Sequence, residues 1–104
     1  MNKSIFILKL KTEPIQNFYK NQITLVQFNA IFPYFKNFFL FENLSIVAWG
    51  NLGDDIIKYY RKGDYVIVEG VLNTIKNNQS IVDVKSEITS LQLTILKIYP
   101  LFTI

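Results

Sequence analysis

The chain has 104 residues, of which 50% are hydrophobic and 18% charged, and its formal net charge is +3 at pH 7. This length suits one domain with one small core, and the mildly basic balance fits a polyanionic partner without requiring one. Cysteine and histidine are both absent, which excludes disulfides, zinc sites built from those ligands, and catalysis by either residue.

The first two predicted elements are strands. Side-chain character alternates from Ser4 to Lys11, which indicates a strand with two different faces. Because the chain begins directly with this segment, we expect no signal or transit peptide. Pro14 ends the strand, since it has no amide proton for a ladder. A turn is expected over Phe18 to Gln22, and a second strand over Ile23 to Ile31.

The next segment, Phe32 to Leu40, is predicted to be a loop rich in aromatic residues. Tyr34, Phe35 and the basic Lys36 lie together in it, a combination that suits a stacking platform for unpaired bases. The alternative is that these rings pack against one another or against a second subunit. The apolar run is interrupted by Asn29, Pro33, Lys36 and Asn37, so we do not expect a membrane-spanning helix here. An amphipathic segment at a membrane surface is an alternative, against which Pro33 argues because it breaks a continuous helix. Surplus apolar surface is instead expected to be covered in a homodimer or homotetramer.

A third strand is predicted from Leu44 to Trp49. Leu44, Ile46 and Ala48 share one face of it, and Trp49 falls on the opposite face together with the small Ser45. Trp49 is therefore expected to lie outside the apolar core.

A helix of about three turns follows, because Leu52, Ile56 and Tyr60 recur at helical spacing on one stripe. Gly63 is expected to cap its C-terminus in a left-handed conformation. Asp54 and Asp55 are expected in the first turn, and Lys58, Arg61 and Lys62 in the last turn, an order that complements the helix dipole.

Two further strands complete the prediction. The fourth strand runs from Tyr65 to Leu72, and Asn73 to Ser80 forms a polar hairpin tip that carries Lys76. The fifth strand runs from about Ile81 to Leu96. Its apolar residues change from one face of the strand to the other between Ile88 and Leu91, which indicates a bulge or bend.

Three short motifs follow one another at fixed spacing in the central part of the chain. They are Trp49-Gly50, Tyr60-Arg61-Lys62-Gly63-Asp64 and Val68-Glu69-Gly70. This arrangement resembles the bacterial and organellar single-stranded DNA-binding protein family. In that family a strand ending in aromatic-Gly enters a helix that ends in a Tyr-Leu-Arg/Lys-Lys-Gly motif, and the next strand ends in Glu-Gly. The spacing here matches without a gap.

The resemblance extends from Met1 to about Ile95 and implies an all-β fold. That fold is a five-stranded OB-fold (Greek-key) barrel with one short α-helix after the third strand. We expect residues 1–104 to form a single domain, with its core at about 3–96 and without the acidic C-terminal tail of bacterial members. In size and composition the chain resembles the small primosomal-like members encoded in algal plastid genomes.

The resemblance also implies a binding face for nucleic acid. Trp49 matches the aromatic residue that stacks on a base in the family, and burial in an oligomer interface is the alternative. Tyr34 or Phe35 matches a further aromatic in the preceding loop. Lys36 and Lys76 are the basic residues retained near the expected groove. Two other stacking positions of the family are occupied by Asn43 and Asn77, which implies weaker binding.

No arrangement of residues in the sequence predicts catalysis. Asp54 and Asp55 are adjacent on the predicted helix and diverge by about 100°, so they do not form an acid/base pair. No phosphate-binding glycine loop is present. The sequence therefore predicts a protein that is not an enzyme and that needs no cofactor or metal.

The function implied by the resemblance is binding of single-stranded DNA, or alternatively RNA, without sequence preference, in organellar DNA replication and maintenance. The alternative function is an OB-fold scaffold or primosome-like interaction module in which DNA binding is weak or lost. Phe, Ile, Asn, Lys and Tyr, which have AT-rich codons, make up 50 of the 104 residues. A plastid genome is therefore expected as the origin, with an AT-rich bacterium or phage as the alternative.

Overall fold

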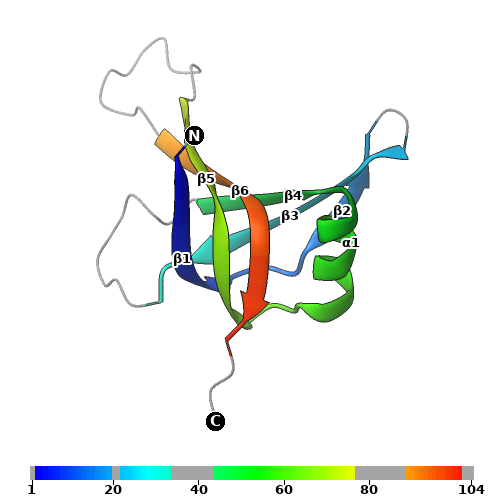
Figure 1. Ribbon diagram of the computed structural model, residues 1–104, viewed down its shortest axis with the longest axis horizontal. Coiled ribbons are helices and arrows are strands. Elements are labelled where there is room, and N and C mark those ends of the chain that lie inside the picture. The colour runs from blue at the N-terminus through cyan, green and yellow to red at the C-terminus, as the bar shows by residue number, and fades with distance from the viewer. Residues whose placement is uncertain (1, 20–21, 34–43, 77–88, 102–104) are drawn as a thin grey trace.

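The computed structural model describes residues 2–19, 22–33, 44–76 and 89–101 (Figure 1). In chain order the elements are β1 (Lys3–Leu10), β2 (Ile15–Phe18), β3 (Thr24–Ile31), β4 (Leu44–Trp49), α1 (Gly50–Tyr59), β5 (Tyr65–Lys76) and β6 (Thr89–Pro100). The predicted loop with Tyr34, Phe35 and Lys36 lies outside the described residues.

Five of the strands close into a ring in the order β1, β5, β6, β4 and β3. The ring closes where Lys9 and Leu10 of β1 pair with Ile31 and Ala30 of β3. The pairing of β4 with β6 is parallel, whereas the other pairs of the ring are antiparallel. Helix α1 follows β4, which is the third strand of the ring in chain order (Figure 1). The predicted five-stranded Greek-key barrel with one helix is confirmed.

Strand β2 is an addition that the sequence did not predict. It forms a short hairpin with β3 through four residue pairs, from Ile15 opposite Gln27 to Phe18 opposite Thr24. The predicted turn over Phe18 to Gln22 is therefore shifted, because Phe18 belongs to the strand. Hydrogen bonds from Tyr19 N to Ile23 O (2.9 Å) and from Gln22 N to Tyr19 O (3.0 Å) close the turn itself.

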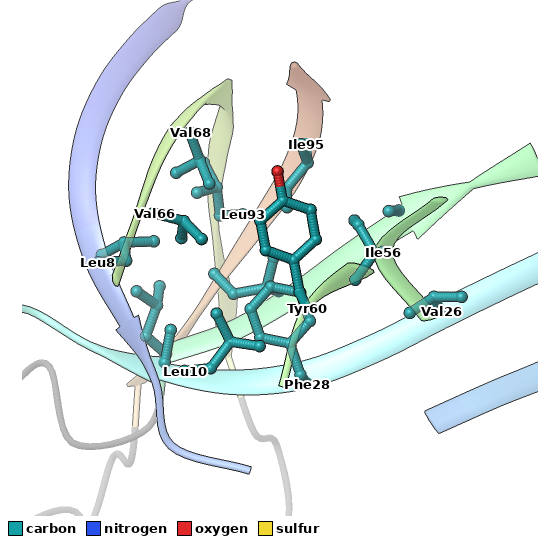
Figure 2. Close-up of a cluster of buried hydrophobic side chains, with 14 residues drawn as sticks. Leu8, Leu10, Val26, Phe28, Ile56, Tyr60, Val66, Val68, Leu93 and Ile95 are labelled. Atoms are coloured by element: carbon teal, nitrogen blue, oxygen red, sulfur yellow. The ribbon is translucent and has the colours of Figure 1, made fainter. Parts of the chain in front are cut away.

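The interior of the barrel is filled by the inward-facing side chains of every strand of the ring, together with Ile56 and Tyr60 from the helix side (Figure 2). Burying one Leu, Ile or Val side chain completely contributes about 1.5–3 kcal/mol to stability. The buried cluster consists of Leu8, Leu10, Val26, Phe28, Ala30, Leu44, Ile46, Ala48, Ile56, Tyr60, Val66, Val68, Leu93 and Ile95.

Helix α1 closes one end of the barrel, and its position depends on Gly53. A Cβ atom at Gly53 would lie 2.9 Å from Cγ2 of Val26 and 3.0 Å from the carbonyl oxygen of Ala48. The absence of a side chain therefore lets the helix backbone approach β3 and β4 closely enough for Ile56 to be fully buried. Within the described ranges, no helix is long and apolar enough to cross a membrane.

The predicted ends of the helix were wrong by several residues. The helix begins at Gly50, which has a φ of +64°, so Asp54 and Asp55 follow the first turn instead of lying in it. It ends at Tyr59, and Tyr60 N donates to Ile56 O at 3.0 Å. Gly63 does adopt the predicted positive φ, of +93°, but in the turn after the helix and not as its cap.

The turn from Arg61 to Asp64 joins the helix to β5 and to the barrel. Arg61 N donates to Asp64 Oδ2 at 2.8 Å, and Asp64 N donates to Arg61 O at 3.0 Å. Gly63 N donates to Leu10 O at 2.9 Å, and Leu10 N donates to Asp64 O at 2.9 Å. These bonds attach the turn to the end of β1.

Strand β5 is longer than predicted, and strand β6 ends later than predicted. β5 continues to Lys76, so residues 73–76 are strand and not hairpin tip; β6 continues to Pro100 instead of ending at Leu96. Their pairing is regular from Thr89 to Ile95, and the register shifts between Glu69 and Gly70. The bulge therefore lies later in the last strand than the predicted position between Ile88 and Leu91.

The bulge yields a prediction for stability. A Cβ atom at Gly70 would lie only 2.3 Å from the carbonyl oxygen of Thr94, so Gly70→Ala should force the two backbones apart. We expect a loss of about 3 kcal/mol in the free energy of unfolding, measured by urea denaturation. Gly63→Ala is the control, because Gly63 has open space and a positive φ, and it should cost about 1–2 kcal/mol. Equal losses for the two variants would contradict the account of the bulge.

Candidate functional site

The outer surface of β3, β4 and β6 carries the candidate site, and Trp49 lies at one end of it. The predicted orientation of Trp49 is confirmed: its side chain is 46% exposed, whereas Leu44, Ile46 and Ala48 are fully buried. Trp49 is the last residue of β4 and pairs with Leu25 of β3. Because side chains alternate along a strand, Trp49 shares the outer face with Ser45 and Val47.

The ring of Trp49 is in contact with the ring of Tyr19, which lies in the β2–β3 turn. The two ring centroids are 5.5 Å apart and the rings are inclined at 56°. Tyr19 is 56% exposed and its neighbour Phe18 is 69% exposed. Leu25, which pairs with Trp49 and points outward beside it, is only 5% exposed. The result is an open aromatic surface on an apolar base.

The sequence prediction missed Tyr19 and Phe18. Both fall in a stretch predicted only as a turn, and the contact with Trp49 depends on the β2–β3 hairpin, which brings residues thirty positions apart into contact. Two adjacent exposed aromatic residues in a polar stretch were the available signal. Exposed aromatics beside a predicted outward tryptophan are typical of a base-stacking surface.

Neutral polar side chains lie across the sheet beyond the aromatic end. One transverse row crosses four strands: Asn29 pairs with Ser45, Ser45 with Gln92, and Gln92 with Asn73. Between this row and Trp49, Gln27 pairs with Val47 and Val47 with Thr94. Adjacent rows on one face of a sheet are about 7 Å apart along the strands, since two residues separate them.

The polar row can form hydrogen bonds without adding charge. Asn and Gln side chains both donate and accept, and the hydroxyl of Ser does the same. Asn29 and Asn73 are exposed, and Ser45 and Gln92 are half-buried. None of the described side chains in these two rows is ionisable. The surface therefore offers stacking at one end and neutral hydrogen bonding across the rest.

Of the five predicted site residues, Trp49 is the one whose side chain the structure describes. Tyr34, Phe35 and Lys36 lie in the range 34–43, outside the described residues. Lys76 is the last residue of β5 and pairs with Thr89. Its backbone lies three residues beyond Asn73 of the polar row, on the same strand. Asn43 and Asn77 also lie outside the described ranges.

Asp54, an acidic residue near this surface, forms a contact between two elements of the fold. Asp54 Oδ1 accepts a hydrogen bond from Gln16 Nε2 at 3.0 Å, which links α1 to β2. Across the parts of the chain that the structure describes, no three Asp or Glu side chains lie close enough together to hold a metal ion.

Sequence comparison finds relatives, although no protein-family model matches the chain. The ycf41 protein of Trieres chinensis, named as a candidate single-stranded DNA-binding protein, is 36% identical over 74 residues. These residues cover 70% of this chain and 66% of that protein, just under two thirds. The thylakoid-associated single-stranded DNA-binding protein of Synechocystis is 31% identical over 98 residues, which cover 91% of this chain and 76% of that protein.

Comparison of structures finds the same fold in two solved proteins. The SSB domain of a Synechococcus protein matches with a TM-score of 0.70 and 20% identity, over 95% of this chain and 94% of that chain. The second single-stranded DNA-binding protein of Mycobacterium smegmatis matches with a TM-score of 0.68 and 18% identity, over 94% and 86% of the two chains. At these identities the similarity establishes the fold.

The contact between Tyr19 and Trp49 can be tested by quenching of fluorescence, because Trp49 is the single tryptophan of the chain. Tyr19→Ala should expose the indole and increase its quenching by acrylamide. The same change should lower the free energy of unfolding by about 0.5–1.5 kcal/mol, the usual contribution of an aromatic pair. Tyr59→Ala, at the other end of α1, is the control. Equal quenching of the two variants would show that the rings do not cover each other.

Proposed function

The chain belongs to the single-stranded DNA-binding protein family, and on this basis we propose that it binds single-stranded DNA without sequence preference. The exposed pair formed by Trp49 and Tyr19, with ring centroids 5.5 Å apart, is the observation that carries the proposal. Aromatic faces accept any base, so such a surface suits binding that ignores sequence. The prediction that the chain is not an enzyme is confirmed by the family to which it belongs.

In the proposed mode of binding, bases stack on the aromatic end and the strand continues across the polar row. Each stacked base contributes about 1–3 kcal/mol. The amide groups of Asn29, Gln92 and Asn73 then hydrogen-bond to bases, sugars or phosphates that pass over β3, β6 and β5. The neutral side chains give these contacts little dependence on salt. We also propose the predicted contacts of Lys36 and Lys76 with phosphates, which supply the salt-dependent part.

Tyr34 and Phe35 are proposed as further stacking residues from the loop that follows β3. The segment connects β3 to β4, the two strands in which Leu25 and Trp49 are paired. Asn43 and Asn77 stand where the family carries aromatic residues. We therefore propose weaker binding than in bacterial members, with stacking concentrated at Trp49 and its neighbours.

We also propose that the protein acts in a plastid, in the replication and maintenance of its DNA. Half of the chain consists of residues with AT-rich codons, and one relative is described as thylakoid-associated. Thylakoids occur in plastids and in cyanobacteria. Immunodetection in purified plastids and in cytosol checks this location, and a signal confined to the cytosol would contradict it.

Binding should favour single strands over duplex, because stacking requires free base faces. With about two to four phosphate contacts, log K should fall against log salt with a slope of roughly −1.5 to −3. A fluorescence titration with labelled oligothymidine at two salt concentrations, repeated with the duplex, measures both quantities. Equal affinity for the duplex, or a slope far steeper than this range, would contradict the proposed mode.

The role of Trp49 has its own test. Oligothymidine should quench the tryptophan fluorescence, and Trp49→Ala should cost about 1–3 kcal/mol of affinity with no loss of fold. Tyr59→Ala is the matched control, because Tyr59 is also an exposed aromatic residue, 68% against 46%, and lies at the other end of α1. Unchanged affinity of Trp49→Ala, together with loss of assembly, would favour the scaffold function instead.

One observation favours that second function, an oligomeric scaffold. The outer face of β1, β5 and β6 carries an apolar row in which Ile7 pairs with Ile67 and Ile67 with Tyr99. Ile5, on the same face, is 67% exposed. Among the described pairings, β1 meets β3 only at Lys9 and Leu10, so the rest of that edge of β1 is free for a second copy.

We propose that this face forms a homodimer or homotetramer. Sedimentation at micromolar concentration should then show at least a dimer, and Ile7→Asp should shift the protein toward the 12.2 kDa monomer, because the interface would bury an unpaired charge. Ile15→Asp is the control, since Ile15 is also an exposed isoleucine, 61% against 39% for Ile7, but lies on β2. A wild-type protein that sediments as a monomer would exclude the proposed assembly.

A further inference from the structure

A cavity of about 450 Å³ opens at the end of the barrel where α1 ends, β5 begins and β6 ends. Figure 1 shows these three chain segments together at the lower end of the molecule. Helix α1 separates the cavity from Trp49 by roughly 15 Å, because its ten residues each rise about 1.5 Å. Its lining consists of Tyr59, Tyr60, Asp64, Tyr65, Pro100 and Leu101.

Backbone hydrogen bonds hold the walls of this cavity in place. Leu101 N donates to Tyr65 O at 3.0 Å, which ties the end of β6 to the start of β5. The Asp64 carboxylate accepts the Arg61 amide at 2.8 Å through Oδ2. A carboxylate has about four lone-pair sites, so Asp64 retains the capacity to accept hydrogen bonds from a ligand. The cavity is therefore formed before any ligand arrives.

The chemistry of the lining favours a cation. Faces of aromatic rings attract positive charge, usually within about 6 Å of the ring centre. Two of the rings already hold a lysine of this chain over their faces. Lys9 Nζ lies 5.3 Å from the centroid of the Tyr65 ring, and Lys58 Nζ lies 5.9 Å from the centroid of the Tyr59 ring. Both distances are near the outer end of that range, so a better-placed cation can replace these lysines.

The charged groups around Tyr60, the buried tyrosine of the cavity, also favour a cation. Burial raises the pKa of the Tyr60 phenol, and the negative charges of Asp55 and Asp64 raise it further. The two nearby cations already have partners within the chain: Arg61 donates to the carbonyl oxygens of Ile57 and Tyr60 at 2.9 Å each, and Lys58 lies over the Tyr59 ring. A positive group in the cavity would be attracted by Asp64 and by the three tyrosine rings of the lining.

We propose that this cavity binds the side chain of a lysine or arginine presented by a partner polypeptide. Its volume lies within the usual range for ligand pockets, about 300–1,000 Å³, and greatly exceeds the volume of about 30 Å³ occupied by a water-sized ion. It has room for the head group near Asp64 and for the aliphatic stem against Tyr59, Pro100 and Leu101. The flanking backbone of the partner fills the remaining space.

Amide NMR spectra of the full chain, titrated with short peptides, test this proposal. Acetyl-Ala-Lys-Ala amide and its arginine counterpart should shift the signals of Tyr59, Tyr65 and Leu101, and the shifts should saturate. Acetyl-Ala-norleucine-Ala amide, which lacks the charge, should bind at least tenfold more weakly. Putrescine, a free diamine without a peptide backbone, should also bind at least fivefold more weakly.

Substitutions in the lining test whether the peptide binds in this cavity. Asp64→Asn keeps a carbonyl oxygen for the Arg61 amide but removes the charge, and should weaken peptide binding at least fivefold. Tyr59→Ala should weaken it several-fold, whereas Tyr59→Phe, which keeps the ring, should not. Asp54→Asn removes an equal charge outside the cavity and is the control.

Three results would overturn the proposal. Equal binding of the norleucine peptide would show an apolar cavity without selectivity for cations. Putrescine binding as tightly as the lysine peptide would identify a site for free amines. Shifts that do not saturate, or that are unchanged in Asp64→Asn, would show that no such site exists.

Discussion

The register of β4 is the constraint on which both the core and the candidate site depend. Its inward residues, such as Ile46, complete the core, whereas its outward residues, Ser45 and Trp49, begin the polar row and the aromatic surface. A slip of one residue would exchange the two sets and place the indole in the core. Antiparallel pairing with β3 and parallel pairing with β6 fix that register from both sides.

Sequence patterns predicted the features that depend on the alternation of side chains within one segment. They missed the features that depend on pairing with another strand. The outward position of Trp49 followed from the residues of its own strand, and the positive φ of Gly63 followed from its place after the helix. The hairpin that carries Tyr19 was missed, because four residues of mixed character become a strand only through pairing with β3. The location of the bulge was wrong for the same reason: Gly70 is required by the backbone of Thr94, a residue of another strand.

The composition of the chain is basic, whereas the described side chains of the candidate interface are neutral, and both facts enter the proposed binding. Stacking at Trp49 and hydrogen bonds from side chains such as Asn29 do not depend on counterion release, whereas phosphate contacts do. Binding that rests on stacking and neutral hydrogen bonds distinguishes single strands from duplex through the exposure of base faces. The cavity beside Asp64 lies beyond the far end of α1, so the site proposed for a basic partner segment does not overlap the surface proposed for DNA.

The central claim is that a single strand crosses the outer face of β3, β4 and β6. Photocrosslinking to an oligothymidine that carries bromodeoxyuridine, followed by mass spectrometry of the adducts, tests it most directly. The account predicts adducts at Trp49 and Tyr19, the aromatic residues that contact each other on this face. Adducts confined to the face of β1 and β5 that carries Ile5 and Ile7, with none at Trp49 or Tyr19, would contradict it.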